Sequence, residues 1–159
     1  MTTTFSQHAN HKQPTSDYCF ICGRKNPVGL KLEFFDNGED EVHSHCVIPE
    51  HFNGYPGVVH GGIVSALLDE GVGRVSLIGD HHNLMMSVVL EVKFRKPVPT
   101  ETELHIVGKR IRMRGRLGQA VGQLFLPDGT LAAESKLNLV KLPRDILKDN
   151  PEALGWRID

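Results

Sequence analysis

The feature that most constrains the fold of this chain is one helical pattern with strand patterns on both sides. From about Gly61 to Gly79, apolar residues recur at the 3.6-residue spacing of a helix that buries one side. The other side carries small and polar residues: Ser65, Asp69, Gly73 and Ser76. This small face predicts that another backbone or a thin ligand packs closely against the helix.

Strand patterns surround this helix. Two come before it, at residues 30–34 and 42–48, where apolar and polar residues alternate. Four follow it, at residues 85–94, 103–111, 118–126 and 131–140, with turns such as Pro127-Asp-Gly129 between them. The order predicts an α+β fold in which an antiparallel sheet packs on one helix.

Composition narrows the class of protein. The chain has 159 residues, of which 40% are hydrophobic and 23% charged, and its formal net charge is −1. These values predict one domain with a real core, and they argue against general nucleic-acid binding. No apolar run approaches the roughly 18–20 residues of a membrane span, so no membrane partner is expected.

The two ends of the chain are polar. Residues 1–17 lack the apolar core of a signal peptide and are expected to be a disordered tail. Residues 143–159 are expected to be a C-terminal tail, with a possible short helix at 144–148 that stops before Pro151. Three cysteines, an odd number, predict a reducing cytoplasmic location.

The start of the helix has the features of a reaction site. Gly61 and Gly62 would let a ligand approach backbone N–H groups that have no partner within the helix. Those groups carry the positive end of the helix dipole, so they can polarise a carbonyl or hold an oxyanion. Asp69, two turns further on, could serve as base or nucleophile. Together these residues predict acyl transfer or hydrolysis.

Two motifs resemble one family. A His60-Gly-Gly turn with an acid nine positions after the histidine resembles the hot-dog-fold acyl-CoA thioesterases. Cys19-Phe-Ile-Cys22-Gly23, followed by Asn26-Pro27-Val-Gly29-Leu30, is similar to the opening of their phenylacetate-pathway-like branch. The resemblance implies a hot-dog domain over residues 18–142, with about five to six strands wrapped around one long central helix. It also implies thioester hydrolysis of an acyl-CoA without metal or other cofactor.

The resemblance also assigns roles to residues. It implies that Asp69 is catalytic and that Gly61 and Gly62 bind the thioester carbonyl, with His60 acting more through its backbone than by proton transfer.

Two further positions are weaker candidates for substrate binding. Asn53 lies seven positions before His60, whereas relatives place a polar residue six before it. Ser87, eighteen residues after Asp69, falls where some relatives place a hydroxyl that positions water.

A run of basic residues spans residues 109–116. Its four arginines are spaced two residues apart, so on a regular strand they would face the same side: Arg110, Arg112, Arg114 and Arg116. Such a run is usually a solvated turn. The phosphates of acyl-CoA must, however, rest on basic residues, and Arg112 and Arg114 are the candidates.

The spacing of Gly62 and Asp69 predicts the assembly. Seven residues along one helix separate them by roughly 10 Å. A base must lie within hydrogen-bonding reach of the atom it serves. Two antiparallel copies can bring the helix start of one chain to Asp69 of the other, as the family does. A homodimer or a dimer of dimers (a homotetramer) is therefore expected.

Two other functions stay open. A non-catalytic acyl-CoA-binding sensor could use the same fold, although binding alone does not need Asp69. The segment from His51 to Pro56 resembles the His-Phe-Pro-Gly-x-Pro loop of hot-dog hydroxyacyl dehydratases. Those enzymes place an acid fourteen positions after the histidine, where this chain has Ser65.

A metal site is the alternative use of the cysteines. Cys19 and Cys22 could form half of a zinc site, completed by Cys46 with His43 or His45. No second Cys-x-x-Cys follows, and three cysteines do not supply four ligands. Packed thiols are therefore expected, without a metal.

Overall fold

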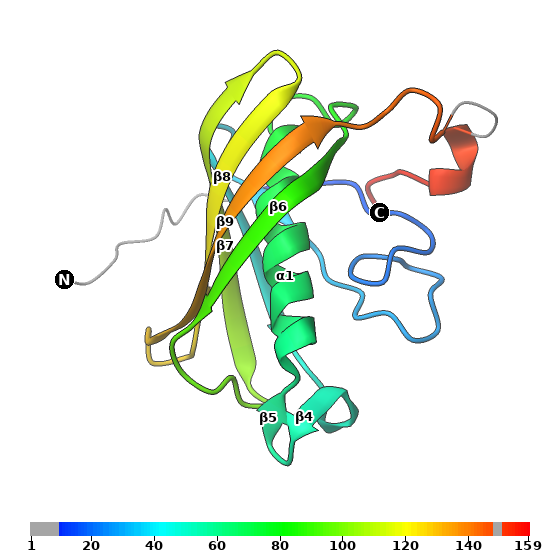
Figure 1. The fold of residues 1–159 in the computed structure, drawn as a ribbon. Helices are drawn as coiled ribbons and strands as arrows, with labels where there is room; N and C mark the ends of the chain where they lie inside the picture. Colours follow the sequence, from blue (N-terminus) through cyan, green and yellow to red (C-terminus); the bar gives the residue numbers. More distant parts are fainter. Residues whose placement is uncertain (1–9, 148–150) are drawn as a thin grey trace.

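The computed structural model describes residues 10–147 and 151–159. One antiparallel sheet of seven strands has the order β1-β2-β3-β7-β8-β9-β6 and curves around helix α1, Gly61–Gly73 (Figure 1). The strands of this sheet are β1 His11–Lys12, β2 Phe35–Asp36, β3 Glu41–Val47, β6 Met85–Phe94, β7 Glu103–Arg114, β8 Leu117–Phe125 and β9 Leu131–Lys141. Strands β4 (Asn53–Tyr55) and β5 (Val58–Val59) form a separate pair before α1. The expected α+β architecture is confirmed.

The sheet has more strands than the five to six expected, because the two-residue strands β1 and β2 extend one edge. The strand expected at 30–34 is absent, and β2 begins only at Phe35. Lys31 has a φ of 55°, a left-handed conformation that breaks an extended strand. Instead, the N–H groups of Leu30 and Leu32 bond the loop carbonyls of Phe20 and Ile21.

The helix is shorter than the pattern predicted. Helix α1 ends at Gly73 and continues as a tighter 3-10 turn, Arg74–Leu77. Such tightening is common at the end of a helix. Gly79, with a φ of 81°, then turns the chain away. No helix in residues 10–147 or 151–159 has the length and apolar character that crossing a membrane requires.

The segments that precede and follow the expected domain pack against each other. Of the expected tail, residues 1–9 lie outside the described residues, whereas 10–17 are part of the fold. Gln13 is fully buried, and its Nε2 donates to Asp36 Oδ2 at 2.8 Å. Thr15 forms an antiparallel bridge with Arg157, so both ends of the chain contribute to one structure.

The C-terminal segment differs in detail from its pattern. Residues 144–147 contain no helix, and 148–150 lie outside the described residues. A short 3-10 helix instead covers Pro151–Leu154, in keeping with the preference of proline for the first turn of a helix.

The core lies between α1 and the concave face of the sheet. Its largest fully buried side chains include Phe34, Leu67, Leu68, Ile106, Leu124 and Leu137. Helix and sheet approach so closely that glycines are needed. A Cβ atom at Gly108 of β7 would lie 2.6 Å from the carbonyl oxygen of Gly71. One at Gly122 of β8 would lie 2.1 Å from Cγ2 of Val72.

Replacement of Gly108 by alanine should therefore destabilise the fold, because its methyl group meets helix backbone that cannot rotate away. We expect Gly108→Ala to lower the free energy of unfolding by about 1–3 kcal/mol, measured by urea denaturation. Gly73→Ala is the matched control. Its Cβ would meet only Leu139 Cδ2, at 4.0 Å, and alanine favours the helical conformation. Equal unfolding midpoints for the two variants would contradict the close approach.

Candidate functional site

Asp69 on α1 is held by a hydroxyl from the edge strand. Ser87 Oγ donates to Asp69 Oδ1 at 2.5 Å. A register shift between Ser87 and Val89 makes Val88 an extra residue in β6. Ser87 and Leu90, three positions apart, thus oppose the buried residues Leu139 and Leu137 and both face the helix. The bulge at Val88 aims the Ser87 hydroxyl at Asp69.

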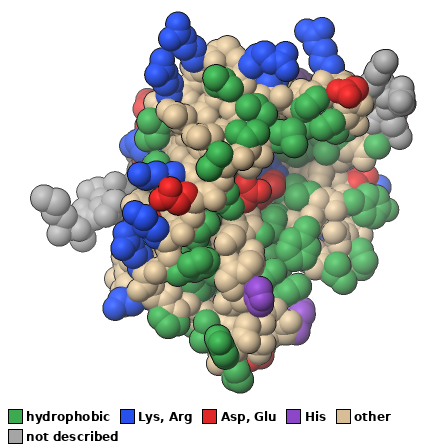
Figure 2. Space-filling view, viewed as in Figure 1, with side chains coloured by type: hydrophobic (Ala, Val, Ile, Leu, Met, Phe, Trp, Pro, Cys, Tyr) green, Lys and Arg blue, Asp and Glu red, His purple; other side chains and the backbone are tan. Residues whose placement is uncertain are grey.

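A cavity of about 290 Å³ opens around Asp69. Gly73 and Ser76 line it, which places two residues of the expected small face at its wall. Leu84, Met85, Met86 and Trp156 provide most of its apolar lining. Figure 2 shows hydrophobic side chains spread over this side of the molecule, with acidic side chains near the middle. The cavity could therefore hold an apolar group of a ligand beside the Asp69 carboxylate.

His60 caps the start of α1. Its Nδ1 accepts a hydrogen bond from the N–H of Gly62 at 2.9 Å, and its carbonyl accepts from the N–H groups of Ile63 and Val64. Gly61 and His60 line a second cavity, of about 650 Å³, which Phe94 also borders. Of the two glycines expected to bind a carbonyl, Gly62 therefore bonds the His60 ring, while Gly61 borders open space.

Asp69 and the helix start are separated within one chain. Their two cavities share no lining residue. Strand β6 passes both. Ser87, near the start of β6, bonds Asp69, and the ring of Phe94, at its end, lies 3.6 Å from where a Cβ at Gly61 would be. The two halves of the expected site thus lie at opposite ends of one strand.

Asn53 is the first residue of β4, in the segment before α1, and is exposed. Its Nδ2 donates to Glu50 Oε1 at 2.8 Å, and it does not line the cavity at the helix start. Glu50 also accepts from Thr100 and from the N–H of Gly57. The bonds from Thr100, Asn53 and Gly57 hold the pKa of Glu50 below its usual value. Glu50, which sequence analysis missed, thus organises this loop.

The arginines of the basic run do not share one face. Arg110 opposes Ala120 and Arg112 opposes Gln119, which are neighbours on β8, so a register shift at Ile111 turns them to opposite faces. Arg110 donates to the carbonyl of Glu39. Arg112 and Arg114 line a cavity of about 750 Å³ that also reaches Val88, the residue after Ser87.

Glu70, the residue after Asp69, pairs with a buried cation. Its Oε1 lies 2.9 Å from Nη2 of Arg74, whose side chain is 2% exposed. The guanidinium lies 4.4 Å from the ring centroid of Phe34 and 5.1 Å from that of Trp156. An acid and an arginine four apart on one helix were a local signal for this pair.

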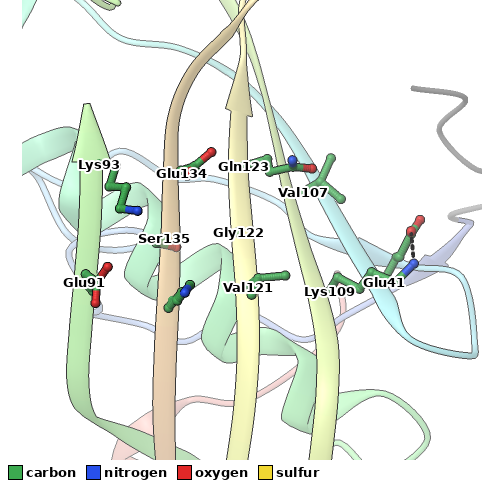
Figure 3. Close-up of a pocket in the computed structure, with 11 residues that line it drawn as sticks. Glu41, Glu91, Lys93, Val107, Lys109, Val121, Gly122, Gln123, Glu134 and Ser135 are labelled. Carbon is green, nitrogen blue, oxygen red and sulfur yellow. Dashed lines mark hydrogen bonds and ion pairs between the residues drawn. The ribbon is translucent and has the colours of Figure 1, made fainter. Parts of the chain in front are cut away.

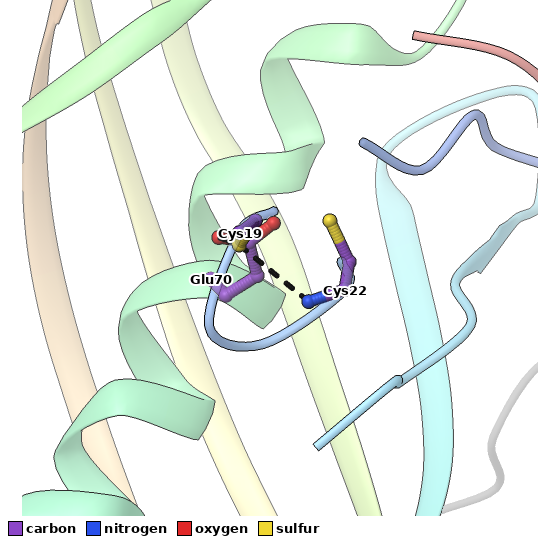
Figure 4. A group of neighbouring side chains, drawn as sticks. All are labelled: Cys19, Cys22 and Glu70. Carbon is purple, nitrogen blue, oxygen red and sulfur yellow. Dashed lines mark hydrogen bonds between the residues drawn. The ribbon is translucent and has the colours of Figure 1, made fainter. Parts of the chain in front are cut away.

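Cys19 and Cys22 lie beside Glu70 (Figure 4). A hydrogen bond from the Cys19 thiol, with help from the charge of Arg74, lowers the pKa of Cys22 to about 6. The same bond, followed by burial, raises the pKa of Cys19.

The ligands suggested by sequence for a zinc site do not assemble with these cysteines. Cys46 packs against the core from β3. His43 and His45 alternate with it and therefore face the outer side of the sheet, where His43 Nδ1 lies 3.0 Å from His105 Nε2.

Another cavity, of about 360 Å³, lies on the outer face of the sheet (Figure 3). Three acids and three lysines line it: Glu41, Glu91, Glu134, Lys93, Lys109 and Lys136. Gly122 faces α1, so its neighbours Val121 and Gln123 in this cavity face away from the helix. The sheet therefore separates this charged cavity from Asp69.

Comparison with known proteins relates about half of the chain to one family. Residues 56–133 match the model of the thioesterase superfamily. Acyl-coenzyme A thioesterase THEM4 of Bos taurus is 24% identical over 135 residues, which cover 84% of this chain and 52% of that protein. The chain thus spans about half the length of this curated relative.

Solved structures agree on the fold. The thioesterase superfamily protein RHA08564 superposes with a TM-score of 0.69 at 23% identity, covering 77% of this chain and 63% of that one. The Escherichia coli PaaI protein from the phenylacetic acid degradation operon gives a TM-score of 0.62 at 13% identity, covering 72% and 81%. With its antiparallel sheet wrapped around α1, the chain has the hot-dog fold, and its residues 56–133 match the thioesterase superfamily.

Proposed function

We propose that this protein is an acyl-CoA thioesterase whose active site is shared between two subunits. The observation that carries the proposal is the Asp69 carboxylate, fixed by Ser87 at the wall of a cavity that polar and apolar side chains line together. The similarity to an acyl-coenzyme A thioesterase supports acyl-CoA as the substrate.

Asp69 is the proposed reacting group. Ser87 binds Oδ1, so Oδ2 is available to take a proton from water or to attack the thioester carbonyl carbon. In either route an oxygen adds to this carbon, the C–S bond breaks, and the sulfur of CoA leaves and is protonated. Where Asp69 itself attacks, water then cleaves the acyl anhydride, which releases the acid and restores the carboxylate. Ser87 fixes the carboxylate orientation in both routes.

The start of α1 is the proposed carbonyl-binding site. Backbone N–H groups at the positive end of the helix stabilise an oxygen that becomes negative during the reaction. Gly61 borders the cavity where such an oxygen would lie. The N–H of Gly62 would join it only when a substrate oxygen replaces the ring of His60.

Strand β6 would bring these groups together across a two-fold axis. It is a ten-residue edge strand, and it exposes Met86, Val88, Val89 and Phe94 by 40–56%. A long apolar edge favours pairing with another strand. Antiparallel pairing of two β6 strands about their middle would bring Ser87 near Phe94 of the partner subunit. Asp69 of one chain would then lie near Gly61 of the other.

The CoA moiety would extend toward the hairpin between β7 and β8. Arg112 and Arg114 line a cavity that reaches Val88, next to the proposed site. Guanidinium groups bind phosphates through paired hydrogen bonds, which suits the diphosphate and 3′-phosphate of CoA.

Asp69→Asn tests the catalytic role directly. We expect kcat for acyl-CoA hydrolysis, followed by detection of free thiol, to fall at least about a hundredfold, since the variant loses a positioned base. Asp128→Asn, in the turn after β8, is the matched control and should keep wild-type turnover. Near-normal turnover by folded Asp69→Asn would refute the assignment. If the wild-type protein binds acyl-CoA tightly but does not hydrolyse it, the sensor function is favoured.

Complementation tests the shared site. A valine at position 61 fills the cavity at the helix start, because its Cβ meets Phe94 at an ordinary 3.6 Å and leaves the His60 cap in place. Gly61→Val and Asp69→Asn should each be inactive alone. After subunit exchange, half of the dimers would be mixed, each with one intact site, and should restore about a quarter of wild-type activity.

The parents, each refolded alone, are the control for this mixing experiment. Mixed dimers would be verified by mass spectrometry. Verified exchange without recovered activity would place both groups of the site within a single chain.

Loss of the two cavity arginines should affect substrate binding rather than turnover. We expect Arg112→Ala/Arg114→Ala to raise KM for acyl-CoA by about tenfold or more, the scale of one to two charge-assisted contacts. A pantetheine thioester, which lacks the nucleotide, should show little change. Arg116→Ala is the control, since Arg116 lines a different, smaller cavity. Equal KM changes for both substrates would contradict phosphate binding.

A further inference from the structure

Three potential metal ligands meet beside α1, on the side of the helix next to Asp69. The sulfurs of Cys19 and Cys22 and a carboxylate oxygen of Glu70 all lie within 4.8 Å of one another (Figure 4). Cys19 Sγ is 3.8 Å from Glu70 Oε2. Nowhere else in residues 10–147 and 151–159 do three such ligand groups come this close.

The loop that carries the cysteines is built to present both sulfurs. Cys19 Sγ accepts hydrogen bonds from the N–H groups of Ile21 at 3.3 Å and Cys22 at 3.5 Å. The N–H of Gly23 bonds the carbonyl of Cys19 at 2.8 Å, and a Cβ at Gly23 would lie 2.3 Å from that oxygen. Glycine is therefore required after Cys22. The bonds from Ile21 and Cys22 hold the Cys19 sulfur in place within the loop.

The charges around the three ligands balance a divalent cation. Arg74 holds Glu70 Oε1 at 2.9 Å, and the other oxygen, Oε2, is the one near Cys19. Two thiolates, one carboxylate and one guanidinium leave two negative charges. A carboxylate ligand whose second oxygen bonds another side chain is a common arrangement around protein-bound metals.

We propose that Cys19, Cys22 and Glu70 bind a divalent metal ion that prefers sulfur ligands, with zinc as the best fit. Two thiolates and one carboxylate match the ligand types of zinc, and a water would fill the fourth position. Around tetrahedral zinc, two sulfur ligands are about 3.8 Å apart, and a sulfur and a carboxylate oxygen are about 3.5–3.7 Å apart. The Cys19 thiol donates a hydrogen bond to Glu70 Oε2 at 3.8 Å, which is close to the second spacing.

The ion would join the N-terminal loop to the helix that carries the proposed catalytic carboxylate. Glu70 directly follows Asp69, so the metal would hold α1 one residue away from the reacting group. The role is structural, and Asp69 itself is not a ligand. Glu70 comes far later in the chain than the cysteines, so their local pattern did not indicate this third ligand.

The same two cysteines could instead form a disulfide. A disulfide does not use a carboxylate, whereas Glu70 Oε2 lies directly beside Cys19, and this contact favours the metal. The two uses differ in mass and in light absorption, so one set of measurements separates them.

Cobalt titration of the full-length, reduced and metal-free protein tests the proposal without any substrate. Tetrahedral Co²⁺ bound to thiolates gives strong visible bands and a sulfur-to-cobalt charge-transfer band. We expect one Co²⁺ per chain, displaced by one equivalent of Zn²⁺, and a higher Tm for the zinc form. Cys22→Ser removes one of the two thiolates and should lose about half or more of the charge-transfer intensity, and Glu70→Gln should bind Co²⁺ about tenfold or more weakly. Cys46→Ala, which removes the third cysteine, should bind normally.

The wild-type protein alone can overturn the proposal, even where a variant fails to fold. Absence of the charge-transfer band in the reduced wild-type protein would exclude binding by the thiolates. A band of undiminished intensity in folded Cys22→Ser would assign the metal to other residues. Mass spectrometry that finds a Cys19–Cys22 disulfide in a protein that takes up no metal after reduction would assign the pair to disulfide chemistry instead.

Discussion

The contact of α1 with the sheet backbone at Gly108 and Gly122 is the constraint on which both candidate sites depend. With no side chain between them, the helix cannot rotate without pressing Gly71 and Val72 into β7 and β8. Asp69 and Glu70 lie about 100° apart around the helix axis. The fixed rotation therefore turns Asp69 to Ser87 on the edge strand and Glu70 to Arg74 and the cysteine loop.

The periodic parts of the fold could be predicted from sequence because their signal is local. Apolar spacing located α1 and the four strands after it, and the motif at His60 located the helix start. The bulge at Val88 could not be predicted in this way. Simple alternation from Leu90 would turn Val88, not Ser87, toward the helix, and one extra residue reverses that. Position 87 was suggested by family resemblance, while its contact with Asp69 depends on the bulge.

Contacts between distant segments could not be predicted from the sequence for a different reason. Pro14 and Trp156 lie at opposite ends of the chain, yet both contact the Arg74 side chain. The pattern around each end is polar and aperiodic, so it predicted tails. A buried guanidinium needs acceptors and aromatic faces around it, and the two ends of the chain supply them. Lys31, whose left-handed backbone displaced the expected first strand, likewise gave no local signal.

The unequal edges of the sheet limit how far this protein could polymerise. Strand β6 has ten residues, whereas β1, at the other edge, has two. The pairing through β6 proposed above would use the same edge of both copies, so it would leave only the two-residue edge at β1 for a third chain. Growth into a continuous fibre needs two extended edges on every copy. A sheet with one long edge can expose an apolar strand for pairing with a second chain without offering a second long edge for further growth. The apolar strand can therefore serve an interface without causing aggregation.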